Sequence, residues 1–240
     1  QMLALYYIYF FLIAVPVLFS LTVLTCIVIL IGTAIGNGSW WGYYPAMVWA
    51  KVFCILSLVK VSVRGRENID KRTSYVFVAN HQGAYDIFSV YGYLGHNFKW
   101  MMKKNLRKIM LVGYTCQKCG HIFVDRSSPT AIRRTIETAE KRLRDGMSLV
   151  VFPEGARTFT GKMGPFKKGA YQLALEFRLP LVPVTIDGSF GIMPRTRYVP
   201  RPGRIVLTIH KPIAPPADEA DRAEVIEQTR QAIESSLGNG

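Results

Sequence analysis

The first 50 residues constrain the fold most, because they contain no Lys, Arg, Asp or Glu at all. From Met2 to Ile35 the sequence is apolar, interrupted only by Pro16 and a few Ser, Thr and Gly residues. About 20 apolar residues are enough for a helix to cross a bilayer. As one helix the run would be about 50 Å long, which exceeds a hydrocarbon core of about 30 Å. We therefore expect a strongly tilted helix or a kink at Pro16.

A second apolar segment follows the turn signal Gly36-Asn37-Gly38-Ser39. The segment from Pro45 to Ser57 is short for a full span, and it predicts a helix that lies in or dips into the membrane interface. Residues 1–58 are thus expected to form a two-helix membrane anchor. A helical hairpin packed on a soluble domain is the alternative. Between the two helices stand aromatic residues of the kind that gather at headgroup level, namely Trp40, Trp41, Tyr43 and Tyr44.

Every charge lies from Lys51 onward, and the formal net charge is +14. A basic domain behind an uncharged leader indicates an anionic membrane surface or an anionic substrate. Because Lys and Arg follow the leader, we expect the inner (cytoplasmic) membrane, with the bulk of the protein on the cytoplasmic side. Nucleic acid would explain the basicity but not the leader, and the aromatic residues do not interleave with the basic ones. We therefore predict no nucleic-acid partner.

The remaining residues, 59–240, are predicted to form one α/β domain with a mixed, largely parallel sheet flanked by helices, preceded by the membrane-anchoring hairpin. The clearest helix begins at Pro129, after a cap at Ser127 or Ser128, and stops at Asp145-Gly146. Other helices are expected over 85–94 and 170–177, and an amphipathic one over 217–237. Apolar or alternating runs predict strands over 59–64, 74–79, 98–102, 121–124, 148–152, 181–186 and 205–209.

The cysteines do not predict a metal site. Cys26 and Cys54 lie in apolar segments and are expected to be packing residues. The stretch from Cys116 through Cys119 to His121 offers three zinc ligands, but no second Cys/His pair follows. We therefore expect no metal, and a reducing compartment, since no disulfide framework is evident.

Residues 80–86, Asn-His-Gln-Gly-Ala-Tyr-Asp, follow a short apolar run that predicts a buried strand. His81 would then stand at the carboxyl end of the sheet, where open α/β sheets bind ligands. Asp86 can reach His81 only if a turn intervenes, and Gly83 permits one. A carboxylate on one imidazole nitrogen makes the other nitrogen a general base near neutral pH. The alternative is a solvated loop histidine and an aspartate that caps the next helix.

Four such polar segments occur in an order that resembles the glycerolipid acyltransferases. Residues 80–86 resemble the HX4D motif of that family, residues 120–126 its second block, residues 152–158 its third and residues 182–184 its fourth. The resemblance covers nearly all of residues 59–211, and within the family it is most similar to the PlsC-like 1-acyl-sn-glycerol-3-phosphate acyltransferases. It implies transfer of an acyl group to the sn-2 hydroxyl of lysophosphatidic acid, which gives phosphatidic acid at the membrane.

The resemblance also implies roles for individual residues. His81 would deprotonate the attacking hydroxyl and Asp86 would orient the imidazole, while acyl-CoA or acyl-acyl-carrier-protein would be the co-substrate, with no cofactor. No Ser or Cys stands in a nucleophile-elbow pattern, so direct transfer is expected. The resemblance implies a set of substrate-binding residues. These are Arg157 for phosphate, Arg126 for phosphate or the thioester side, Glu154 to hold Arg157 or the hydroxyls, backbone N–H groups near Gly155 for the oxyanion, Lys104 (or Lys103) as a further cation, and Pro183 in the acyl channel or at a strand end.

Two alternatives stay open at this point. The acceptor could be another lysolipid, or the protein could bind anionic lipid at the membrane without chemistry. For the residues themselves, Arg126 and Glu154 could form an ordinary ion pair, and Arg157 could be a plain surface residue.

Overall fold

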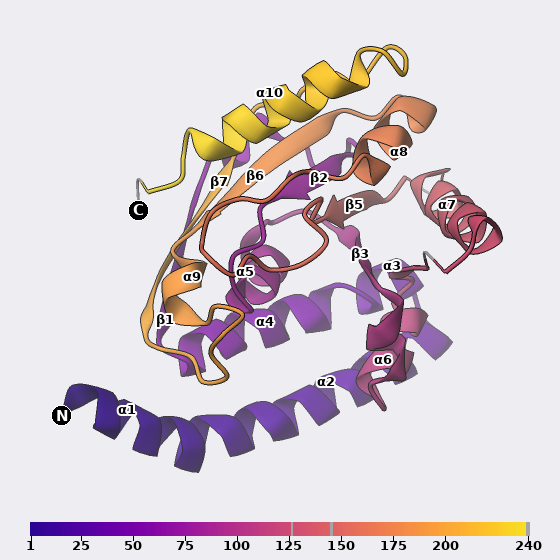
Figure 1. Cartoon of the computed structure of the whole chain (residues 1–240). Helices are drawn as coiled ribbons and strands as arrows, with labels where there is room; N and C mark the ends of the chain where they lie inside the picture. Colours follow the sequence, from indigo (N-terminus) through magenta and orange to yellow (C-terminus); the bar gives the residue numbers. More distant parts are fainter. Residues whose placement is uncertain (126, 145, 239–240) are drawn as a thin grey trace.

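A computed structural model describes residues 1–125, 127–144 and 146–238. At its centre is a seven-stranded sheet with the strand order β1-β7-β6-β2-β5-β3-β4 (Figure 1). Strands β6, β2, β5, β3 and β4 are parallel, whereas β7 is antiparallel to β6 and β1 is parallel to β7. The predicted mixed, largely parallel sheet is confirmed. The strands are β1 (Val59–Arg64), β2 (Val76–Ala79), β3 (Phe98–Lys103), β4 (Ile122–Val124), β5 (Ser148–Val151), β6 (Leu181–Asp187) and β7 (Gly203–Ile209).

This topology decides where the polar segments meet. Because the five parallel strands point the same way, the segments that follow β2, β3, β4, β5 and β6 all emerge at one edge, which we call the carboxyl edge. Strand β2 lies between β5 and β6, so residues 80–86 emerge in the middle of that edge. Strands β1 and β7 run in the opposite direction, so their amino-terminal ends lie at the carboxyl edge.

Helices cover both faces of the sheet (Figure 1). On one face α5 (Tyr85–Tyr93) and α4 (Tyr44–Leu56) enclose the largest buried cluster, which includes Phe77 and Val182 of the sheet. On the other face lie α7 (Pro129–Arg144), α8 (Gly169–Phe177) and α10 (Arg222–Glu234). The alternation of inward side chains along each strand separates the two cores, as expected for a sheet buried on both sides.

Two of these helices test the predicted helix ends. The Ser128 hydroxyl accepts a hydrogen bond from the Ala131 N–H, so Ser128 caps α7. The predicted stop at Asp145 lies outside the described residues, and Gly146 follows with φ 77°. The helix predicted over 217–237 is shorter, because the Asp218 carboxylate accepts N–H bonds from Ala220 and Asp221 in a turn that precedes α10.

The N-terminal apolar run forms one long helical segment, Met2–Ile35, which is long and apolar enough to cross a membrane. It consists of α1 (Met2–Tyr9), a π-helical turn η1 (Phe10–Ala14) and α2 (Val15–Ile35). The π turn stands directly before the Pro16 region, where the missing N–H weakens the helical ladder. After α3 (Gly38–Trp41) the chain reverses into α4.

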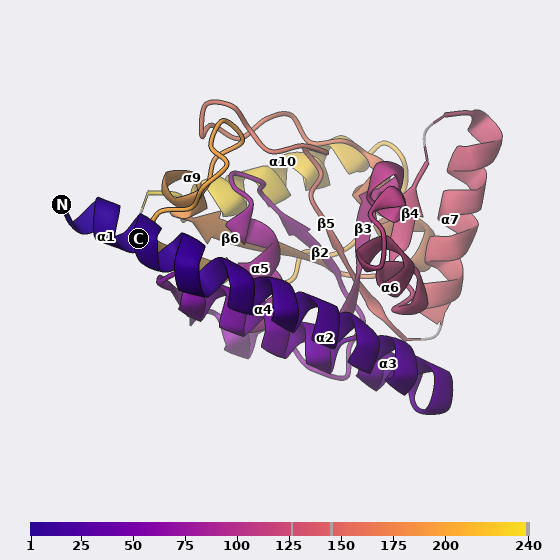
Figure 2. The same ribbon diagram turned by 90° about the horizontal axis from the view of Figure 1, so that it is seen from below.

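The long helix lies lengthwise against the rest of the protein (Figures 1 and 2). Three side-chain hydrogen bonds between described residues hold it there. The Tyr6 hydroxyl donates to the Ser57 carbonyl at 3.2 Å, the Tyr9 hydroxyl to the Leu56 carbonyl at 3.1 Å, and Trp49 Nε1 to the Thr22 hydroxyl at 2.9 Å. Helix α4 in turn contributes to the core of the sheet, so residues on both sides of the predicted boundary at 58 pack together. One stripe of the long helix is buried along its length, formed by Tyr6, Phe10, Ala14, Leu18, Cys26 and Ile29.

Candidate active site

The middle of the carboxyl edge is fixed by Asn80, the first residue after β2. Its side-chain amide donates to the Ile186 carbonyl at 2.9 Å and accepts from the Ile186 N–H at 2.7 Å. Asn80 is fully buried, so both of its polar atoms need these partners. The bonds tie the end of β2 to β6 and define the point at which the chain leaves the sheet.

The structure brings His81 and Asp86 together. His81 Nδ1 lies 2.7 Å from Asp86 Oδ2, and this oxygen also accepts the N–H groups of Gln82 at 2.7 Å and Gly83 at 2.9 Å. Asp86 is fully buried in the first turn of α5. Position 83 requires a glycine, because a Cβ there would lie 2.5 Å from the Ser189 carbonyl oxygen. We call residues 80–86 the base loop.

The His81 ring is held on one face by an aromatic side chain that the sequence analysis did not single out. Its plane lies 8° from that of Phe152, with ring centroids 4.0 Å apart, and Phe152 stacks in turn on Trp100. Only 13% of the His81 side chain is exposed. With Nδ1 on the carboxylate, Nε2 is left without a hydrogen-bond partner in the described part of the chain. Its lone pair is therefore available as a base.

Glu154 supports the base loop through backbone groups. Its Oε1 accepts the His81 N–H and its Oε2 accepts the Gly164 N–H, each at 2.7 Å. Burial raises the pKa of this carboxyl, while the two backbone hydrogen bonds oppose the rise. Sequence reasoning expected Glu154 to hold Arg157 or a substrate hydroxyl. Both oxygens are instead bonded to the loops on either side, so Glu154 positions His81 rather than the guanidinium.

Backbone N–H groups near Gly155 are expected to serve the oxyanion, and the N–H of Gly155 itself has a partner within the protein. Its N–H donates to the Phe152 carbonyl at 3.0 Å, in a turn where Gly155 has φ 76°. This N–H is therefore already used. The Lys167 side chain lies close to this glycine. A Cβ added at Gly155 would lie 2.6 Å from Lys167 Nζ. A larger residue would be strained by the positive φ and would displace Lys167.

Basic side chains stand around the base loop with far more freedom. Arg157 is half-buried, and the described residues offer its guanidinium no hydrogen bond or ion pair. Lys104, after β3, pairs with Asp125, after β4, at 2.6 Å, and the Lys104 side chain is 56% exposed. Lys103 is exposed beside it. We call Lys103, Lys104 and Arg157 the basic rim. The predicted phosphate ligand Arg126 lies outside the described residues.

Two further residues singled out from the sequence, Pro183 and His121, are buried inside the fold. Pro183 is buried within β6 opposite Val78, so it does not end a strand as one reading proposed. His121 is buried, and its Nδ1 accepts the Trp100 N–H while its Nε2 lies 3.4 Å from the Tyr91 hydroxyl. Burial lowers the pKa of His121 to about 3. Both ring nitrogens are engaged, and no group of three or more metal-ligating side chains occurs among the described residues.

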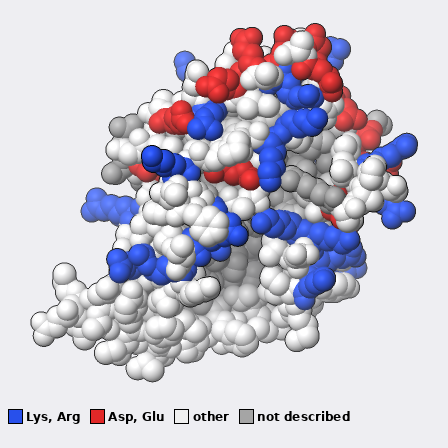
Figure 3. Space-filling view, in the orientation of Figure 1, with Lys and Arg blue, Asp and Glu red and all other residues white. Residues whose placement is uncertain are grey.

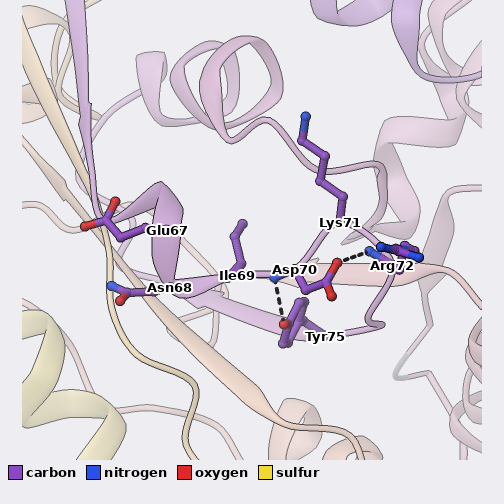
Figure 4. A pocket seen from close by; sticks show the side chains of 7 residues that line it. All are labelled: Glu67, Asn68, Ile69, Asp70, Lys71, Arg72 and Tyr75. Atoms are coloured by element: carbon purple, nitrogen blue, oxygen red, sulfur yellow. Dashed lines mark hydrogen bonds between the residues drawn. The ribbon is translucent and has the colours of Figure 1, made fainter.

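The surface agrees with this placement. In Figure 3, Lys and Arg side chains gather on both sides of a hollow in the middle of the molecule, above an underside without charges. The pocket in Figure 4, from Glu67 to Arg72 with Tyr75, lies at the start of β2 and thus away from the carboxyl edge. A second pocket adjoins the base loop, lined among others by Gln82, Lys162, Asp187, Arg230 and Glu234.

Comparison with known proteins identifies relatives of the chain. A family model described as Acyltransferase matches residues 60–187. A 1-acyl-sn-glycerol-3-phosphate acyltransferase of Chlamydomonas reinhardtii is 34% identical over 182 residues, which are 74% of this chain and 53% of that protein. A protein of the same name from Saccharomyces cerevisiae is 31% identical over 202 residues, 79% of this chain and 65% of that protein. The chain spans about half the length of several curated relatives that it matches.

A solved structure is similar over nearly the whole chain. The crystal structure of the 1-acyl-sn-glycerophosphate (LPA) acyltransferase PlsC from Thermotoga maritima superposes with a TM-score of 0.78 at 26% sequence identity. The match covers 98% of this chain and 94% of the other. The likeness therefore includes the N-terminal helices as well as the sheet.

Proposed function

The chain belongs to the acyltransferase family, and we propose that it acylates the sn-2 hydroxyl of lysophosphatidic acid to give phosphatidic acid. The observation that carries the proposal is the 2.7 Å contact between His81 Nδ1 and the buried Asp86 carboxylate, at the centre of the carboxyl edge. The names of the relatives support the acceptor, since several are 1-acyl-sn-glycerol-3-phosphate acyltransferases.

The proposed mechanism is direct transfer. His81 Nε2 takes the proton of the sn-2 hydroxyl while that oxygen attacks the carbonyl carbon of the acyl thioester. The tetrahedral intermediate then collapses, the carbon–sulfur bond breaks, and the thiolate leaves with the proton that the imidazolium returns. Asp86 stabilises the imidazolium in the intervening state. General-base assistance of this kind is worth roughly 10²–10⁴ in rate.

The basic rim would hold the acceptor. Arg157 offers a planar fork that fits a phosphate monoester, and its guanidinium has no competing partner in the described residues. Lys104 is a weaker candidate because Asp125 already shares its charge. The acyl donor, either acyl-CoA or acyl-acyl-carrier-protein, would be a co-substrate, and the proposed chemistry needs no cofactor.

We place the protein on a membrane surface, in one leaflet of the bilayer. The long N-terminal helix is apolar, and its outer face exposes side chains such as Leu12 at 72% and Phe19 at 71%. Its other face packs along the protein, which supports a helix that lies in one leaflet rather than one that crosses the bilayer alone. The position of the Lys and Arg residues after the leader favours the cytoplasmic face of the inner membrane.

The proposal is tested by supplying acyl-CoA and lysophosphatidic acid in detergent micelles, and measuring released thiol and phosphatidic acid together. We expect one thiol released for each phosphatidic acid formed, and no release without acceptor. Lysophosphatidylcholine, which lacks a terminal phosphate monoester, should be a poor acceptor. Intact thioester in the presence of lysophosphatidic acid would show a lipid-binding protein, and equal use of both lysolipids would refute the proposed acceptor.

A further inference from the structure

The segment that follows β3 presents apolar side chains to solvent. It consists of a 3₁₀ turn η3 (Lys104–Lys108), a sharp tip, and helix α6 (Val112–Lys118). Single exposed apolar residues are normal on a protein surface, but a group of them marks an interaction site. Residues 106–114, which we call the apolar tip, include Leu106 at 40% exposure, Ile109 at 49%, Met110 at 91% and Tyr114 at 53%.

The backbone of the apolar tip is held in one conformation. Leu111 has φ 60°, which is uncommon for a residue other than glycine, and the N–H groups of Val112 and Gly113 bond the Met110 and Ile109 carbonyls at 2.6 and 2.7 Å. A side chain at Gly113 would collide with the Arg107 carbonyl. Met110 is thus presented outward by a built turn. Strained backbone of this kind persists at functional positions.

Cations surround the apolar tip. Arg107 and Lys108 lie within the tip, between Leu106 and Ile109, and are exposed. Lys118 ends α6 with its amine 5.4 Å from the centre of the Tyr114 ring. In the described part of the chain, none of these three has a carboxylate partner within ion-pair distance. Apolar side chains flanked by Lys and Arg are typical of segments that bind the interface of an anionic membrane.

The apolar tip is continuous with the long N-terminal helix. Helix α6 packs against α2, and Figures 1 and 2 show α6 beside the second half of α2 on the same underside of the molecule. The outer face of α2 exposes Leu24, Ile27 and Ile31. At its other end the segment begins at Lys103 and Lys104, so it connects the basic rim directly to the underside.

We infer that the apolar tip is a second membrane-inserting element, which enters the same anionic leaflet as α1–α2. This inference rests on the proposed function in one respect, namely that α1–α2 lies in a bilayer. The axis of the long helix and one further point of contact together define a plane, so the tip holds the basic rim at the level of the headgroups. An anionic acceptor lipid then reaches the basic rim by lateral diffusion, without leaving the bilayer.

The depth of the tip is measured with an environment-sensitive fluorophore on one introduced cysteine at a time, in a Cys116→Ser background with intact α1–α2. The three native cysteines that remain, Cys26, Cys54 and Cys119, are buried. Labels are placed at Met110→Cys, at Leu12→Cys in the turn η1 of the long helix, and at Ile132→Cys, an exposed apolar position on α7. In vesicles containing phosphatidylglycerol we expect brominated lipids to quench the labels at 110 and 12 but not at 132. Quenching at 12 without quenching at 110 overturns the inference alone. Absence of quenching at both positions overturns the inference and the membrane placement together.

Activity gives an independent readout. The Ile109→Asp/Met110→Asp variant should lose about tenfold in the rate on lysophosphatidic acid in anionic vesicles, because charge at the tip opposes insertion. On a short-chain acceptor in solution the rate should be unchanged, as it should in both assays for the matched Ile132→Asp variant. An equal loss in both assays would show a folding defect rather than lost insertion, and no loss in vesicles would also contradict the inference.

Substitution of Arg107 and Lys108 distinguishes binding to an anionic membrane from binding to an acidic carrier protein. The Arg107→Glu/Lys108→Glu variant should lose activity in anionic vesicles with acyl-CoA and keep it in zwitterionic vesicles. If the loss occurs with acyl-acyl-carrier-protein but not with acyl-CoA in the same vesicles, these residues dock the carrier protein and the inference fails.

Discussion

The base loop and the basic rim stand at the same edge of the sheet, but they are built differently. In the base loop, Asn80 and Asp86 are fully buried, and His81 is fixed by a carboxylate, a stacked ring and its own backbone bonds. In the basic rim, Lys104 is largely exposed and paired only with Asp125, and Arg157 has no described partner.

The difference follows from what each region has to do. A general base must point at one hydroxyl, and a misplacement of about 1 Å can cost about 10²-fold in rate. Its orientation is therefore set in advance by packing. Phosphate-binding cations must exchange water for a charged ligand, and burying them unpaired in the empty site would be costly. They are therefore left at the surface, with side chains that can move.

Among the tests of this comparison, removal of the general base His81 should have the largest effect on the rate. His81→Ala should lower kcat by roughly 10²–10⁴, because no other described side chain replaces Nε2 beside Asp86. Turnover of acyl-CoA with lysophosphatidic acid measures this, and flotation with vesicles should show unchanged membrane association. His210→Ala, at a histidine that bonds Thr185, is the matched control and should stay active. Near-normal turnover of His81→Ala would refute the mechanism.

Glu154 tests whether the base loop depends on positioning. Glu154→Gln replaces one acceptor oxygen with an N–H₂ group that faces a backbone donor, either His81 or Gly164. We expect kcat to fall by about 10² with little change in KM, since the base moves while the rim stays. Glu137→Gln on the exposed face of α7 should behave as the unaltered protein. A rise in KM with constant kcat would instead place Glu154 on the acceptor.

The basic rim should respond in binding rather than in the chemical step. Arg157→Ala should lower kcat/KM for lysophosphatidic acid by about 10- to 100-fold, the worth of a hydrogen-bonded charge, mainly through KM. Lys104→Ala should cost less, because Asp125 already takes part of its charge. Titration of rate against acceptor concentration in micelles compares the two. A larger effect at Lys104 than at Arg157 would reverse the assignment within the rim.

The last prediction concerns stability rather than rate, and it tests β4, which leads to Asp125 beside the rim. Burial lowers the pKa of His121 from 6.5 to about 3. Below pH 6.5 the unfolded chain therefore binds a proton that the folded chain does not, and the free energy of unfolding falls. The loss is about 1.4 kcal/mol per pH unit until pH 3 is approached.

Denaturation in detergent between pH 8 and pH 5 measures that loss of free energy. His96 and His210 also have lowered pKa values, so each of them decreases the free energy of unfolding in the same direction. Hydrogen exchange locates it, and we expect amides of Ile122–Val124 to lose protection before those of Val76–Ala79. A free energy of unfolding that stays constant below pH 6.5 would contradict this account.

Much of the molecule could be predicted from local sequence. Local patterns of hydrophobicity and capping predict three of its features: the apolar leader, the α7 cap at Ser128 and the strand before His81. Neighbouring residues alone carry the signal for each of them. The pairing of His81 with Asp86 was predicted on the condition of a turn at Gly83, and the turn is present. Helix α6 and the apolar tip were not predicted, because seven residues with no cap or periodic stripe give little signal.

Other features have no local signal at all. Phe152 lies 71 positions from His81 in sequence, and only the parallel pairing of β2 with β5 stacks the two rings. The same pairing turns Glu154 toward the backbone of His81 instead of toward Arg157.

The sequence by itself determined which residues can carry charge or take a proton, and which segment avoids water, since these are properties of side chains. Tertiary structure decided which of those residues meet and how tightly each is held. A hydrogen bond or a stacked ring depends on ångström distances between strands that lie far apart along the chain. Those distances are set by the packing of the whole sheet.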